Sequence, residues 1–120
     1  YLADGLDCDA DGCWFEERSP GYNSVANMGV LALADLLDRP SLADAVVRNG
    51  RFVLRCLQPN GEIDSSFSHR QDRGEASCRP STYGVARRWA QLTGDGRFTA
   101  LAQRLLPVNP TGTCGASAWP

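Results

Sequence analysis

"NSVANMGVLALADLL", residues 23–37, is the stretch of sequence that decides the fold. Its apolar residues recur at helical spacing, at Val25, Met28, Ala32 and Leu36, and this period predicts an α-helix. Further apolar residues fill the remaining sides, so that the helix is apolar nearly all round. Such a helix is expected to occupy an inner position in an array of helices.

Three further segments carry helical patterns. "DRPS" ends the first helix, and Ser41 with Asp44 three residues later resembles a capping box for an amphipathic helix over residues 42–57. Apolar spacing predicts a third helix over residues 81–93 and a fourth over residues 97–106. The sequence therefore predicts an all-α fold.

The lengths of the connections predict how these helices are arranged. Short connections make an antiparallel hairpin of residues 23–57 and a second of residues 81–106. The opening loop, residues 1–22, and the long connection, residues 58–80, each lead into a hairpin, so both are expected at the same end of the bundle. Long connections are where function is usually found. Within this one, "GEIDSSF" predicts a short β-like turn over residues 61–67.

Composition limits the class of protein. With 120 residues, 42% of them hydrophobic and 22% charged, the chain has the size and balance of a single globular domain, residues 1–120, with an irregular tail at residues 107–120. A net charge of −2 argues against nucleic acid as a partner, and no apolar run is long enough for a membrane. Five cysteines without a CxxC pair indicate neither a zinc site nor a complete disulfide framework. A reduced, cytoplasmic protein is favoured, although the compartment stays open.

The opening loop carries an acidic pattern that resembles half of a calcium site. Asp7, Asp9 and Asp11, followed by Gly12, match the first half of an EF-hand loop, in which alternating carboxylates converge on the ion. Arg18 stands where the bidentate glutamate belongs, so the second half does not match. A solvated acidic turn is the default interpretation and calcium the alternative. No other cofactor is expected.

Three motifs in order suggest a family. "DGCWFEERSPGYN" (residues 11–23), "QPNGEID" (58–64) and "SFSHRQDR" (66–73), with a hairpin after the first and another after the last, resemble heparinase II/III-like proteins and related alginate and uronate polysaccharide lyases over roughly residues 4–106. The resemblance implies that the hairpins form part of an (α/α) toroid with a sugar-binding cleft at one end of its inner helices. A full ring has more helices than four, so a longer chain or a homo-oligomer would complete it.

The resemblance also implies an activity, which is β-elimination on an acidic poly- or oligosaccharide. Such a lyase removes the C5 proton of a uronate and expels the C4 oxygen, which requires a base, an acid and a group that neutralises the carboxylate. The implied proton-transfer pair is Tyr22 and His69. The implied substrate-binding residues are Glu17, Asn23, Asn27, Arg70, Gln71 and Asp72.

Each of these residues also has a purely structural interpretation. Asn23 fits a helix N-cap, Tyr22 a hydrophobic staple, and His69 a solvated loop residue. Two other functions stay open. A glycoside hydrolase-like toroid would use two opposed carboxylates such as Glu17 and Asp72, and a non-catalytic helical-repeat module would bind glycan or protein through the same face.

Overall fold

The computed structural model describes residues 5–15, 18–74 and 81–106. Its helices are α1 (Pro20–Leu36), α2 (Ala43–Arg55), α3 (Ser81–Thr93) and α4 (Gly96–Leu105), with a short 3₁₀ helix, η1 (Pro40–Leu42), between the first two. The described ranges contain no β-strand, so the predicted all-α class is confirmed. The β-like turn is reduced to a single bridge between Leu57 and Ile63.

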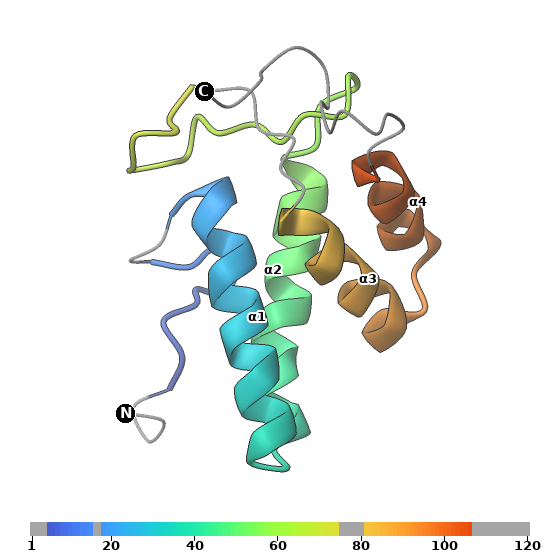
Figure 1. Ribbon diagram of the computed structural model, residues 1–120. Coiled ribbons are helices and arrows are strands. Elements are labelled where there is room, and N and C mark those ends of the chain that lie inside the picture. Colours follow the sequence, from blue (N-terminus) through green and yellow to red (C-terminus); the bar gives the residue numbers. More distant parts are fainter. Residues whose placement is uncertain (1–4, 16–17, 75–80, 107–120) are drawn as a thin grey trace.

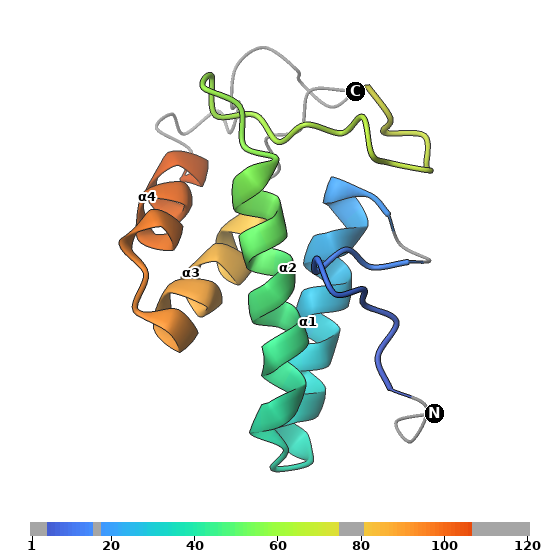
Figure 2. The ribbon, with the colours of Figure 1, turned by 180° about the vertical axis from the view of Figure 1, so that it is seen from behind.

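The four helices form two antiparallel hairpins, as predicted. Figures 1 and 2 show α1 and α2 as one long hairpin, with α3 and α4 as a shorter hairpin beside it. The helix α3 packs against both α1 and α2, and α4 packs against α3. The connection after α2 crosses the end of the bundle at which α1 begins (Figure 1).

One hydrophobic core holds the hairpins together, with Trp89 at its centre. The indole Nε1 donates a hydrogen bond to the carbonyl oxygen of Val46 at 2.8 Å, and the ring centroid lies 5.4 Å from that of Phe98. Gly50 makes this packing possible, because a Cβ atom there would lie 2.9 Å from the Trp89 ring. Glycine in a helix interior costs about 1 kcal/mol relative to alanine, and here it allows α2 and α3 to approach closely.

The helix α1 begins earlier than predicted. Ser19, not Asn23, is its N-cap, because the Ser19 hydroxyl accepts a hydrogen bond from the Tyr22 amide at 3.3 Å. Pro20 occupies the first helical position, where its missing N–H is no loss and its fixed φ suits the helix. Asn23 therefore lies inside the first turns of α1.

The predicted capping box before α2 is wrong. Pro40 to Leu42 forms the 3₁₀ helix, and the N-cap of α2 is Leu42, which makes no side-chain hydrogen bond to the helix. Ser41 is thereby drawn into the 3₁₀ turn and does not occupy the cap position, so Asp44 falls in the first turn of α2 without the reciprocal bond.

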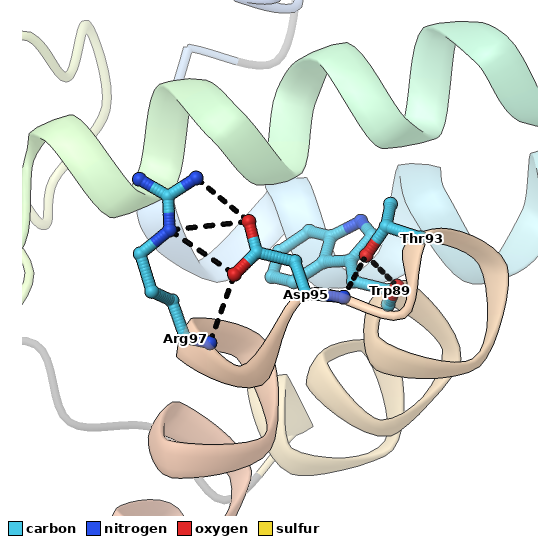
Figure 3. Close-up of polar contacts among 4 residues, drawn as sticks. All are labelled: Trp89, Thr93, Asp95 and Arg97. Atoms are coloured by element: carbon cyan, nitrogen blue, oxygen red, sulfur yellow. Dashed lines mark hydrogen bonds and ion pairs between the residues drawn. The ribbon is translucent and has the colours of Figure 1, made fainter.

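The turn between α3 and α4 is held by local side chains, shown in Figure 3. The Thr93 hydroxyl donates to the carbonyl of Trp89 at 2.7 Å and accepts from the amide of Asp95 at 3.1 Å. Asp95 then caps α4, accepting from the amide of Arg97 at 2.9 Å and pairing with its guanidinium at 2.7 Å. These hydrogen bonds lower the pKa of Asp95 to about 2, and they set the direction in which α4 leaves the turn.

The expectation that α1 occupies an inner position among the helices is not met on one side of α1 in the described structure. Only one face of α1 packs against α2 and α3, while Val25, Met28 and Leu36 on the other side are exposed. None of the helices in the described ranges combines the length and apolar character needed to cross a membrane.

Candidate functional site

The opening loop and the loop of residues 68–74 meet where α1 begins. The backbone amide of His69 donates to the carbonyl oxygen of Arg18 at 2.9 Å, and the Ser19 hydroxyl donates to the Asp72 carboxylate at 2.5 Å. Both bonds join segments about fifty residues apart in sequence. The prediction that these two segments lie at the same end of the bundle is confirmed for the last residues of the opening loop, Arg18 and Ser19, whereas Gly12 lies beside the middle of α2.

Asp72 is the residue that fastens the second loop in place. Its side chain is buried, with 5% of the residue exposed, and its other carboxylate oxygen accepts from the Ser68 hydroxyl at 2.5 Å. The Ser68 oxygen in turn accepts from the backbone amide of Arg70 at 3.0 Å. Asp72 therefore ties the N-cap of α1 to the loop, and this internal role differs from the substrate contact predicted for it.

An aromatic ring and a cation meet on the surface of this site. The guanidinium carbon of Arg70 lies 4.5 Å from the centroid of the Tyr22 ring, within the range of a cation–π interaction. Tyr22, His69, Arg70 and Gln71 are all exposed, and Tyr22 lies in the first turn of α1, where the helix dipole is positive. The structure thus brings four of the predicted site residues to one end of the bundle.

Asn23 follows Tyr22 in the chain but is almost completely buried. Only 2% of it is exposed, and neither its side-chain nitrogen nor its oxygen has a hydrogen-bond partner in the described structure. A buried polar group left without a partner costs about 1 to 3 kcal/mol. Such groups are rare in folded proteins and call for a specific reason.

Asn27 belongs to the interior. Its oxygen accepts from the Trp14 indole at 3.2 Å, and its nitrogen donates to the Asn49 oxygen at 2.7 Å. Asn49 then donates to the carbonyl of Gly12 at 2.7 Å. These four residues, which we call the amide chain, fasten the opening loop to α1 and α2. Asn27 is fully buried, so this predicted substrate contact is a structural residue in the folded chain.

Asn49 was not among the residues singled out from the sequence, although a signal was present. Asn49 and Gly50 are adjacent in the middle of α2, and both residue types are poor helix formers. Such a pair in an otherwise regular helix indicates that tertiary contacts determine the choice of residue.

The acidic opening loop forms a tight turn. The Asp9 carboxylate accepts from the backbone amide of Cys13 at 2.8 Å and lies 3.9 Å from the Arg18 guanidinium. Asp11 uses its carbonyl oxygen to accept from Arg55 at 2.8 Å. Within the described residues, which include Asp7, no three His, Cys, Asp or Glu side chains gather in a way that could hold a metal ion.

Gly12 sets how closely this turn approaches α2. Its φ is +94°, and a Cβ atom there would lie 2.3 Å from the carbonyl oxygen of Arg48. Both the positive φ and the contact exclude other residue types, so the loop depends on a glycine at this position.

The described cysteines are poor nucleophiles. Cys8, Cys13 and Cys56 are free thiols, and burial raises the pKa of each, that of Cys56 to about 11. Because the thiolate is the reactive form, these residues stay largely unreactive at neutral pH. Cys78, Cys114 and the predicted site residue Glu17 lie outside the described residues.

No protein-family model, curated protein or solved structure matches the chain. The geometry at the start of α1 is thus the basis for a proposed function.

Proposed function

We propose that this chain acts on carbohydrate and catalyses β-elimination on a uronate-containing poly- or oligosaccharide at the start of α1. The observation that carries the proposal is the 4.5 Å contact between the Arg70 guanidinium and the Tyr22 ring, next to His69 in the same loop. The two hairpins would form an arc of an (α/α) toroid of the heparinase II/III-like kind. In such an arc, the loops at the beginning of α1 would border the sugar-binding cleft.

In the proposed reaction, Tyr22 and His69 are the proton-transfer pair. One accepts the C5 proton of the uronate, and the other donates a proton to the departing C4 oxygen. The C5–H and C4–O bonds break, and a C4=C5 double bond forms. Arg70 supplies positive charge for the substrate carboxylate, because charge that develops next to the carboxylate needs a fixed counter-charge. Gln71 is exposed beside it and offers amide hydrogen bonds to sugar hydroxyls.

The buried predicted residues take different parts in this proposal. Asn23 would contact the uronate only if substrate binding opens the packing over it, since its amide is buried and without a partner in the described residues. Asp72 and Asn27 support the site from inside through their hydrogen bonds.

A second candidate function is a non-catalytic helical-repeat module that binds glycan through the same surface. An exposed aromatic ring beside a cation is also what a binding surface for an acidic sugar requires, so the Tyr22–Arg70 contact fits this alternative as well. A hydrolase-like mechanism has less support, because both oxygens of the Asp72 carboxylate already accept hydrogen bonds from serine hydroxyls.

The test is ultraviolet absorbance of the conjugated alkene during incubation of the protein with a panel of uronate polysaccharides. We expect a rise for the unaltered protein and for Tyr83→Phe, and none for Tyr22→Phe. Tyr83 is a matched control, because its ring also lies 6.0 Å from an arginine, Arg87, but both residues belong to α3 and not to the loops at the start of α1. Calorimetric titration with the same glycans separates the alternatives.

If the glycans bind without any rise in absorbance, and if Arg70→Ala weakens that binding, the result favours the non-catalytic binding module. If no uronate glycan gives a rise in absorbance and none binds to the protein, both functions are refuted.

A further inference from the structure

The side of α1 that points away from α2 and α3 is an apolar surface. At 3.6 residues per turn, the buried positions Asn23, Asn27, Leu31 and Ala34 lie along one side of the helix. The opposite side, which we call the open face, consists of Val25, Met28, Gly29, Ala32, Leu33 and Leu36, all exposed.

No charge interrupts the open face. The only charged residue of α1 is Asp35, which lies to one side and pairs with Arg88 of α3 at 3.3 Å. Val25 is 68% exposed and Leu36 is 81% exposed. Single exposed apolar residues are normal on protein surfaces, but a contiguous uncharged row of them marks an interaction surface.

The order of large and small residues on the open face is self-complementary. If two α1 helices pair antiparallel, Val25 of one copy faces Leu36 of the other, Met28 faces Ala32, and Leu33 faces Gly29. The midpoints of these pairs fall between Val30 and Leu31, at Val30 and at Leu31, so one twofold axis at this level brings every pair to within about one residue of register. Each of the two large central side chains then meets a small one. In a twofold interface, each residue of one copy must fit the residue that it faces on the other copy, and the same contact occurs twice. An interface with a different partner does not require this self-complementary order.

The area of the open face is that of a weak dimer. The exposed fractions of the large side chains correspond to on the order of 500 Å² per copy, within the range of the largest apolar patch on a typical monomer. Two copies would bury about 1,000 Å², close to the lower limit of about 1,200 Å² for stable specific interfaces. We therefore expect a dimer that dissociates on dilution.

The geometry points to the open face of α1 as a homodimer interface in which two copies pair antiparallel about Val30 and Leu31. This inference does not depend on the proposed chemistry.

The test is sedimentation velocity over a concentration series. We expect the unaltered chain to pass from monomer to dimer, and Val25→Lys and Leu36→Glu each to weaken the dimer at least tenfold. Combined, the two substitutions put opposite charges at facing positions and should recover much of the association. Because both residues are mostly exposed, the fold should persist, which far-ultraviolet circular dichroism checks.

Leu92→Glu is the matched control, since Leu92 is 43% exposed but lies on α3, and it should leave the dimer intact. A monomer at every concentration, a dimer that neither substitution weakens, no recovery in the double variant, or an assembly larger than two would each overturn the inference.

Discussion

Truncating Asn27 is expected to destabilise the fold, because it breaks the amide chain in the middle. Asn27→Ala removes the acceptor of the Trp14 indole N–H and the donor to the Asn49 oxygen. Both partners are buried, so neither finds water in the folded state. Each unpaired group costs about 1 to 3 kcal/mol, so the two together give a loss of about 2 to 6 kcal/mol. That is a large part of the 5 to 15 kcal/mol that typically stabilises a domain.

Urea denaturation followed by circular dichroism and tryptophan fluorescence measures this loss. Asn60→Ala is the control, because Asn60 also makes two hydrogen bonds, both to the neighbouring Glu62, but on the exposed surface. It should change the free energy of unfolding by no more than about 0.5 kcal/mol.

A double-mutant cycle tests the cause. Trp14→Phe removes the indole donor, so Asn27→Ala should cost less in that background than in the unaltered protein. A loss below about 1 kcal/mol, or strictly additive losses, would refute the role assigned to the amide chain. If Asn27 contacted substrate, as the sequence predicted, its truncation would instead lower glycan affinity and leave stability unchanged.

Two further predictions follow from the backbone and from one carboxylate. Gly12→Ala should lower the free energy of unfolding, measured by urea denaturation, by at least about 2 kcal/mol, because it combines a strained φ with the contact to the Arg48 carbonyl. Gly74→Ala is the control, since φ is also positive there but the space is open, and it should cost about half as much. Asp95 has a folded pKa of about 2 against 3.8 ordinarily, so its ionised form stabilises the fold above about pH 4, and that contribution is lost as the pH falls toward 2. The melting-temperature difference between the unaltered protein and Asp95→Asn should shrink accordingly over this range, and a constant difference would contradict the prediction.

The sequence predicted the helices well because their patterns are local. Period and turn residues located all four to within a few residues, including the stop of α3 before Gly94, whose φ is +67°. The start of α1 was missed because "SPG" reads as a turn, although a serine cap followed by proline is also a helix start. The capping box at Ser41 failed because Pro40 initiates a tighter helix first. Local signals thus compete, and the sequence alone does not show which one prevails.

Burial around α1 could not be predicted in the same way. A helix that is apolar nearly all round gives no indication of which side its neighbours cover, and here the covered side contains Asn23, Ser24 and Asn27 while Val25 and Leu36 face outward. Ser24 and Asn27 are inside because they bond across elements, Ser24 to Thr82 of α3 at 3.0 Å and Asn27 to Asn49 of α2 at 2.7 Å. Only the three-dimensional arrangement provides those partners.

The candidate site and the amide chain are physically coupled through the opening loop. That loop has no regular structure between Gly5 and Phe15 beyond one bridge, so its position depends on Trp14 and Gly12, which the amide chain holds. The same loop continues to Arg18 and Ser19, whose bonds to His69 and Asp72 position the second loop. A substitution that breaks the amide chain should therefore disturb the surface around Tyr22 as well. Reduced activity in an Asn27 variant is consequently no proof of substrate contact, and the decisive comparison is activity per folded molecule.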